Sequence, residues 1–182
     1  LFKNIIFHAT SEAERQDIIK TLGKSNQIKI AGNLSKKIAL APFQIKQKEK
    51  GELKLFNIAR VAPEKNLKFA LEILGDVKSK VHFDFYGPIY DEVYYETCKH
   101  IISQLPTNIV VNYKGVIPNT EVNKALLDYH AMLMPTLGEN FGHIILESLI
   151  AACPVIISDQ TPWQNLENEH AGWSIPLSQK QK

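Results

Sequence analysis

The sequence predicts an α/β fold in which helices cover both faces of a parallel β-sheet. Short β-rich runs are the first observation, and they occupy residues 54–59, 81–86, 109–113, 131–134 and 154–157. Helical periodicity between these runs is the second, at residues 66–74, 91–105, 120–129 and 141–152. Strands and helices that alternate in this way build a Rossmann-like, doubly wound parallel sheet. Such sheets bind ligands at the carboxyl ends of their strands.

The N-terminal part of the chain follows a less regular pattern. Ser11 and Glu14 have the spacing of a capping box, which predicts a helix from there to about Leu22. Strands are predicted on either side of this helix, at residues 4–8 and 27–31.

A solvated run of charges, residues 45–52, separates this region from the first strong strand. We expect three parts. Residues 1–35 would come from a preceding domain, residues 36–52 would form a linker or a strand that enters the sheet, and residues 53–182 would form the sheet domain. A chain of 182 residues suits one domain with a core of its own plus such a remnant.

Composition argues against several classes of protein. The chain has 21 Lys and Arg against 19 Asp and Glu, too balanced to predict nucleic-acid binding, and no basic stripe is interleaved with aromatic residues. Trp163 and Trp173 are instead predicted to pack in the last loop and strand. Cys98 and Cys153 fall in predicted helices, form no disulfide framework, and are expected to pack in a reducing compartment. No apolar run reaches the roughly 18 residues that span a bilayer.

A glycine-containing loop, residues 138–142, runs directly into the last predicted helix. Free backbone N–H groups and the positive end of the helix dipole favour phosphate at such a position. Glu139 lies in this loop, and Glu147 follows eight residues later in the helix. A carboxylate on the helix could accept hydrogen bonds from both hydroxyls of a ribose. The alternative is that Glu147 is an ordinary exposed helix residue, and periodicity alone favours that alternative.

Two cations follow the strand at residues 54–59. Arg60 stands at the carboxyl end of the strand, and Lys65 precedes the next helix. An arginine fork and a lysine point charge suit a diphosphate. The alternative is a surface loop with two solvated charges, and neither this loop nor the glycine-containing loop identifies a function alone.

Together these features resemble the retaining glycosyltransferases of family 4, which have the two-lobed GT-B fold. The resemblance covers residues 53–177, and the Glu139-to-Glu147 spacing is the signature of that family. The other matching features occur in the order of the family: Arg60 and Lys65, Gly87 after its strand, the turn at residues 113–116, and the sequences at 135–142 and 153–156. Residues 7–12 look like the end of the family's N-terminal lobe.

The resemblance implies a role for each residue. Arg60 and Lys65 would hold the donor diphosphate, Glu147 would bind the ribose hydroxyls, and Glu139 would act as the catalytic residue that contacts the transferred sugar. The remaining donor contacts would be Gly115, Val116 and Ile117 beside the base, and Asn140, Phe141, Gly142, His143 and Ile144 beside the phosphates. Protein cations would neutralise the leaving group, so neither a metal nor another cofactor is expected.

The implied activity is transfer of a sugar from a nucleotide-sugar, with retention of the anomeric configuration. UDP is the commonest donor nucleotide in the family and GDP the next. The acceptor is expected to be a glycan or a lipid-linked precursor, as in polysaccharide biosynthesis, and the enzyme to be cytoplasmic with peripheral contact at the inner face of the membrane. We expect this chain to be the donor half, without the acceptor lobe and the final crossover helix, and to be inactive alone.

Three alternatives are weighed against this interpretation. A degenerate transferase lobe could serve only as a nucleotide-binding or assembly module, but such a lobe has no reason to keep all four charged residues. A sugar-nucleotide epimerase could share the GT-B scaffold, but epimerases normally lack this loop and helix. A dinucleotide-dependent oxidoreductase is disfavoured because Arg60-Val-Ala-Pro63 stands where GxGxxG would follow the first strand.

Overall fold

The computed structural model describes residues 5–23, 27–33 and 48–178. The chain divides into two compact units, Leu1–Ile38 and Ala39–Lys182. Most of the predicted linker, residues 36–47, and residue 4 of the first predicted strand lie outside the described residues. Each unit is described by itself.

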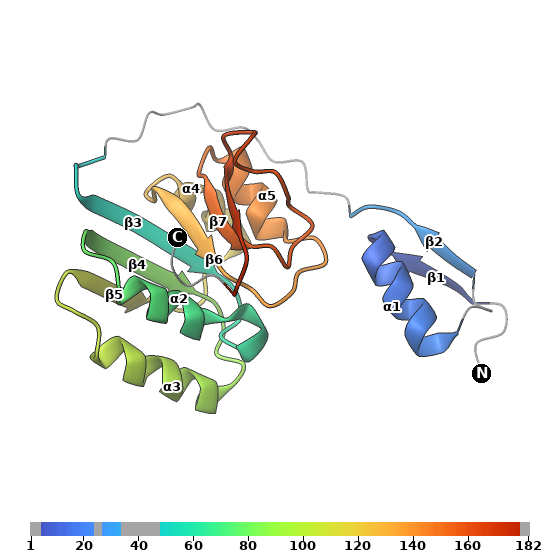
Figure 1. Ribbon diagram of the computed structural model, residues 1–182, viewed down its shortest axis with the longest axis horizontal. Helices are drawn as coiled ribbons and strands as arrows, with labels where there is room; N and C mark the ends of the chain where they lie inside the picture. Colours follow the sequence, from blue (N-terminus) through green and yellow to red (C-terminus); the bar gives the residue numbers. More distant parts are fainter. Residues whose placement is uncertain (1–4, 24–26, 34–47, 179–182) are drawn as a thin grey trace. The chain divides into compact units, whose positions relative to one another are not determined.

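The small unit is a short strand–helix–strand motif (Figure 1). Its elements are β1 (Ile6–Ala9), α1 (Glu12–Leu22) and β2 (Gln27–Ile30), with β1 and β2 parallel. The predicted helix start is confirmed, because the Ser11 hydroxyl accepts a hydrogen bond from the Glu14 N–H at 3.2 Å. The Glu14 carboxylate turns back to Thr10, whose N–H and hydroxyl both donate to it at 2.6 Å. The capping box therefore closes one residue earlier than the usual pattern.

The large unit confirms the predicted fold class. Its six parallel strands lie in the order β5-β4-β3-β6-β7-β8. The strands are β3 (Glu52–Ile58), β4 (Lys80–Tyr86), β5 (Ile109–Tyr113), β6 (Ala131–Met134), β7 (Val155–Ser158) and β8 (Gly172–Ile175). The helices are α2 (Leu67–Leu74), α3 (Glu92–Ser103), α4 (Asn119–Leu126) and α5 (His143–Ile150), with a short 3-10 turn, η1, at Pro63–Lys65.

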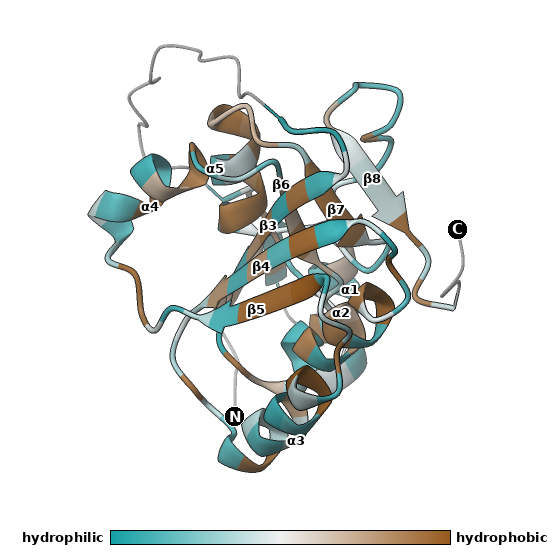
Figure 2. Cartoon of the chain, turned by 90° about the vertical axis from the view of Figure 1, so that its left-hand side faces the viewer, coloured by the Kyte–Doolittle hydropathy of each residue, from teal (hydrophilic) through white to brown (hydrophobic). Residues whose placement is uncertain are grey.

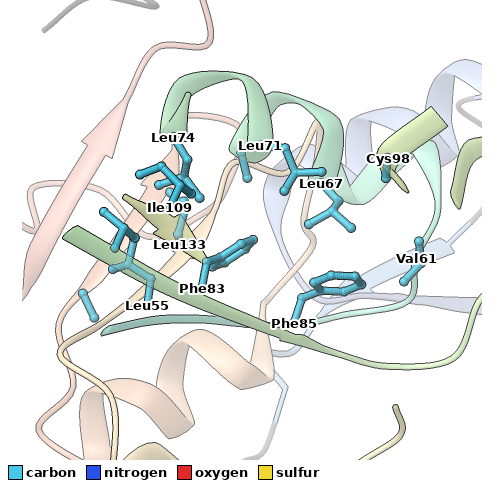
Figure 3. Close-up of a cluster of buried hydrophobic side chains, with 13 residues drawn as sticks. Leu55, Val61, Leu67, Leu71, Leu74, Phe83, Phe85, Cys98, Ile109 and Leu133 are labelled. Atoms are coloured by element: carbon cyan, nitrogen blue, oxygen red, sulfur yellow. The ribbon is translucent and has the colours of Figure 1, made fainter. Parts of the chain in front are cut away.

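The sheet separates two hydrophobic cores. Helices α2 and α3 cover one face, and α4 and α5 cover the other (Figure 1). Successive residues of β3 point to opposite faces, so Leu55 packs under α2 whereas Phe56 packs under α4 and α5. Phe83 and Phe85 fill the α2 core (Figure 3). The central strand β6 is apolar and buried along its whole length because both of its sides are covered.

On the opposite face, the two helices differ in character. Figure 2 shows α4 as mainly hydrophilic and α5 as mainly hydrophobic. Ile145 and Ser148 of α5 are buried, and Val122 and Leu126 of α4 are the buried residues of that helix. Residues 119, 120, 121 and 124 of α4 are exposed, whereas His143 is the only exposed residue of α5, so α5 lies deeper.

The two cysteines are free and buried, as packing residues would be. Cys98 lies inside α3 as predicted, and burial raises the pKa of its thiol to about 11. The prediction that Cys153 is helical was wrong, because α5 ends at Ile150 and Cys153 precedes β7. Helix α5 ends before Cys153 because the chain must turn back toward the sheet to form β7.

The prediction of packing holds for one tryptophan and fails for the other. Trp163 packs against the α5 core and donates a hydrogen bond from its ring N–H to the Phe141 carbonyl. Trp173 is 47% exposed. The reason is its position on β8, the last strand in the order, with a neighbour on one side only.

The backbone segments that follow β3 and β4 continue side by side in parallel and approach each other closely at Gly87. The Ala59 N–H donates to the Tyr86 carbonyl at 3.0 Å, and the Val61 N–H donates to the Pro88 carbonyl at 2.9 Å. A Cβ atom on Gly87 would lie 2.0 Å from the Ala59 carbonyl oxygen. Gly87 also has φ +132°, which disfavours any other residue. This close parallel pairing fixes the start of the loop that contains Arg60.

Replacing Gly87 with Ala should lower the free energy of unfolding by about 3 kcal/mol or more, since strain and a backbone clash add. Chemical denaturation would measure the loss. Gly51→Ala is the matched control, because Gly51 has φ +83° but a Cβ atom there meets nothing within 4 Å. Its loss should be about 1–2 kcal/mol, from backbone strain alone. Equal losses in the two variants would contradict the importance of this close backbone approach.

Candidate functional site

The candidate site lies where neighbouring strands β3 and β6 end and the chain departs in opposite directions. From β3 the chain continues to β4 on one side, and from β6 it continues to β7 on the other. In Figure 1 the carboxyl ends of these two parallel strands point to the same end of the sheet. Parallel sheets bind ligands in the crevice at such a switch point. The loop at residues 59–66 and the loop at residues 135–142 meet there.

Backbone and amide hydrogen bonds join the two loops. The Leu137 N–H donates to the Glu64 carbonyl at 2.9 Å. The Asn66 side-chain amide donates to the Pro135 carbonyl, also at 2.9 Å. The loops therefore form one surface, although about 70 residues separate them in the sequence.

An ion pair connects two of the predicted site residues. The Lys65 ammonium lies 2.7 Å from a carboxylate oxygen of Glu139. The two side chains are only 17% and 21% exposed, so solvent screens their attraction incompletely. The sequence predicted both residues in the site, one for phosphate and one for sugar. Their direct contact was not predicted.

Arg60 is held in place from two sides. Its guanidinium lies 3.1 Å from the Glu64 carboxylate and 4.8 Å from the centre of the Tyr90 ring. Both members of the ion pair are about half exposed, so the pair contributes little to stability. Tyr90 was not predicted as a site residue. It could have been found as an aromatic residue three positions after Gly87, just beyond the carboxyl end of β4.

Gly142 is the N-cap residue of α5 and has φ +76°. A Cβ atom there would lie 2.6 Å from the Ile145 side chain and 3.1 Å from Cγ of Glu139. Glycine thus lets the Glu139 loop approach the helix. No side chain among the described residues caps this helix, and its first turn has no acidic residue. The N–H groups in the first turn of α5 therefore form the positive end of a helix dipole that no acidic side chain of that turn neutralises.

The remaining predicted residues of this loop and helix have different surroundings. Asn140 and His143 are exposed, whereas Phe141 and Ile144 are partly buried. The Phe141 ring contacts the His143 ring, with their centres 4.7 Å apart. Glu147 lies in the second turn of α5 and is partly buried, so it is less exposed than an ordinary solvent-facing helix residue.

The segment predicted to meet the base follows β5. The Gly115 carbonyl accepts a hydrogen bond from the Gly87 N–H at 2.9 Å, which links this segment to the paired backbone beside Arg60. Val116 is 67% exposed, and Ile117 packs against the α5 core. The segment is therefore anchored at both ends and presents Val116 to solvent. Its role with a base remains a prediction.

Within the described residues, no group of three or more His, Cys, Asp or Glu side chains is arranged to hold a metal ion. No helix in the described parts of the chain is long and apolar enough to cross a membrane.

A cavity of about 810 Å³ lies apart from these residues, on the α2 face of the sheet. Its lining is mostly apolar and comes from α2, several strands and the segment after β8, including Phe69, Leu133, Ile156 and Leu177. Arg60, Lys65, Glu139 and Glu147 do not line it.

Two cations and a helix N-terminus at the switch point of a doubly wound sheet are an arrangement suited to phosphate. The chain belongs to the family described as "Glycosyl transferases group 1", which matches residues 40–179. It is thus a glycosyltransferase domain. A comparison with curated proteins found no match.

Solved structures share the fold. TarM is 23% identical to the chain, with a TM-score of 0.70 over 95% of this chain and 34% of TarM. HepE of Anabaena, in complex with UDP and glucose, is 16% identical, with a TM-score of 0.70 over 85% of this chain and 44% of HepE. WaaG, a glycosyltransferase involved in lipopolysaccharide biosynthesis, is 12% identical, with a TM-score of 0.72 over 95% of this chain and 50% of WaaG. The chain therefore spans a third to a half of each structure's length.

Replacing Glu139 with Gln should tighten the binding of pyrophosphate about fivefold, which corresponds to about 1 kcal/mol. The anion competes with the Glu139 carboxylate for Lys65, and the amide removes that competition. Calorimetry at low salt would measure the change. Glu64→Gln is the control, and it should have a smaller effect because its pair with Arg60 is more exposed. Weaker binding in Glu139→Gln would contradict the competition.

Proposed function

We propose that this chain is the donor-binding domain of a retaining glycosyltransferase whose donor is a nucleotide-sugar, with UDP as the nucleotide. The observation that carries the proposal is the contact between Lys65 and Glu139 at the switch point, 2.7 Å apart. A phosphate group seeks the cation, and sugar hydroxyls seek the carboxylate. A ligand in which a phosphate is joined to a sugar satisfies both at once.

The diphosphate would lie between the cations and the start of α5. Arg60 and Lys65 would contact its oxygens, together with the N–H groups of the first turn of the helix. Positive groups in this position stabilise the charge that develops on a departing nucleoside diphosphate. The protein's own cations supply this stabilisation in the proposed mechanism, without a bound metal.

The reaction takes place beside Glu139 in this proposal. The bond between the anomeric carbon and the phosphate oxygen breaks, and its electron pair leaves with the nucleoside diphosphate. The Glu139 carboxylate stabilises the positive charge on the sugar. The acceptor hydroxyl oxygen bonds to the anomeric carbon on the same face, and its proton passes to the leaving phosphate oxygen. The anomeric configuration is therefore retained.

The outer parts of the donor would use the remaining predicted residues. Glu147 would accept hydrogen bonds from the ribose hydroxyls, and residues 115–117 would contact the base. The choice of UDP is supported by HepE, whose structure contains UDP and glucose.

The proposal for the whole enzyme rests on the share of each similar structure that this chain covers. Since this chain spans a third to a half of its structural neighbours, we propose that residues 53–182 form the donor domain and that a second lobe binds the acceptor. A glycan or a lipid-linked precursor is the proposed acceptor, handled on the cytoplasmic side of a membrane. The involvement of WaaG in lipopolysaccharide biosynthesis supports this class of acceptor.

Replacing Lys65 with Ala should weaken UDP binding about ten- to a hundredfold, because a charge-assisted hydrogen bond to phosphate is lost. Arg60→Ala and Glu147→Ala should weaken it as well. Lys68→Ala is the matched control, since Lys68 is an exposed lysine on α2 that pairs with Glu72. Calorimetric titration with UDP, GDP and ADP would measure these affinities and identify the base. Equal UDP affinities in the Lys65 and Lys68 variants would contradict the assignment.

An active enzyme that contains this chain should form a product with the anomeric configuration of its donor. Proton NMR during the reaction would show the configuration of the first product formed. Glu139→Ala should lower the rate about a hundredfold or more if the carboxylate stabilises the transition state. An inverted product would exclude the proposed same-face reaction.

A further inference from the structure

A buried hydroxyl group lies beneath the ion pair of the candidate site. Thr136 is completely buried and follows β6 by two residues. Its hydroxyl oxygen lies 3.0 Å from the Glu64 carbonyl oxygen and 2.9 Å from the Gly138 carbonyl oxygen. The hydroxyl has a single hydrogen, which these two acceptors share.

The two acceptors occupy related positions in the chain. Glu64 immediately precedes Lys65, and Gly138 immediately precedes Glu139. One hydroxyl therefore contacts the backbone directly before each member of the ion pair. The Leu137 N–H reaches the same Glu64 carbonyl at 2.9 Å, so two adjacent residues fix that carbonyl.

The backbone of Thr136 is itself fixed from a third strand. The Ser158 hydroxyl, at the end of β7, donates to the Thr136 carbonyl at 2.5 Å, and Ser158 is 1% exposed. Buried hydroxyl and carbonyl groups are costly to leave without partners. The arrangement of β3, β6 and β7 therefore determines where Thr136 lies, and Thr136 in turn determines where the two loops meet.

We infer that Thr136 is a positioning residue, which sets the geometry of Lys65 and Glu139 through the backbone carbonyls that precede them. A valine in this position would keep the volume but would leave the Glu64 carbonyl with one donor fewer. The loops could then separate, and Lys65 would no longer be held in place beside Glu139 and the start of α5. The expected effect on the donor rests on the proposed function, whereas the effect on the ion pair does not.

The first test compares UDP with uridine, which has no phosphate. Thr136→Val should weaken UDP binding about five- to tenfold and leave uridine binding unchanged, since the phosphate contacts alone depend on the loops. Thr136→Ser keeps the hydroxyl and should restore the affinity. Calorimetry, with uridine measured by competition, gives both values. An unchanged UDP affinity in Thr136→Val would overturn the inference.

A matched control separates positioning from stability. Ser148 is also completely buried, and its hydroxyl donates to the Cys153 carbonyl at 2.8 Å, beyond the far end of α5. Ser148→Ala should lower stability to a similar extent without changing the affinity for UDP. Equal weakening of UDP binding in Ser148→Ala and Thr136→Val would overturn the inference, because a general loss of stability would then explain both.

The second test needs no nucleotide. A double-mutant cycle of Lys65→Met and Glu139→Gln, followed by chemical denaturation, measures the coupling of the pair. The coupling should be a factor of about three in the unfolding equilibrium constant, and Thr136→Val should abolish it while Thr136→Ser retains it. Coupling that persists in Thr136→Val would overturn the inference. Thr136→Ala, which places no methyl group against the two carbonyls, replaces Thr136→Val in both tests if the valine variant does not fold.

The two tests distinguish failure of the inference from failure of the proposed function. If the wild-type chain binds no nucleotide while the double-mutant cycle behaves as expected, the donor assignment fails and the role of Thr136 stands. If UDP binds and both measurements are insensitive to Thr136→Val, the role of Thr136 fails and the donor assignment stands.

Discussion

The pairing of β3 with β6 is the constraint on which the candidate site depends. The ladder between them is short, with Leu55 opposite Ala131 and Phe56 opposite Met132. Beyond it, side-chain amides continue the connection: the Asn57 amide donates to the Leu133 carbonyl at 2.8 Å, and the Asn66 amide to the carbonyl after β6. Asn57 is 4% exposed, so its amide satisfies a carbonyl that water does not reach. The diverging strands thus remain close enough for their loops to form one surface.

The charges on that surface are balanced before any ligand arrives. Lys65 faces Glu139 and Arg60 faces Glu64, at 2.7 and 3.1 Å. The first pair is less exposed, so its attraction is stronger and an incoming anion must overcome more of it. A phosphate alone gains the cation but leaves the carboxylate without its partner. The sugar hydroxyls of the proposed donor would compensate the carboxylate.

Backbone contacts hold the edge of the site together. Gly87 lets the paired segments after β3 and β4 approach closely, and its N–H donates to the carbonyl of Gly115 after β5. Gly142 lets the Glu139 loop approach α5. Both positions combine a positive φ with a close neighbour, so a side chain would move the loops apart. The loops of four strands are therefore parts of one frame, and the charged side chains extend from it.

The elements and their order could be predicted from the sequence, because the spacing of apolar residues is a local property. The predicted elements include the strands β3 to β7, the helices between them, and the loops that contain Arg60, Lys65 and Glu139. Which loops meet could not be predicted, because the strand order depends on contacts between distant segments and on no local periodicity. The Lys65–Glu139 contact joins residues 74 positions apart. Thr136 likewise matters only through carbonyls that the fold brings beside it, and the exposure of Trp173 follows from the place of its strand at the edge of the sheet.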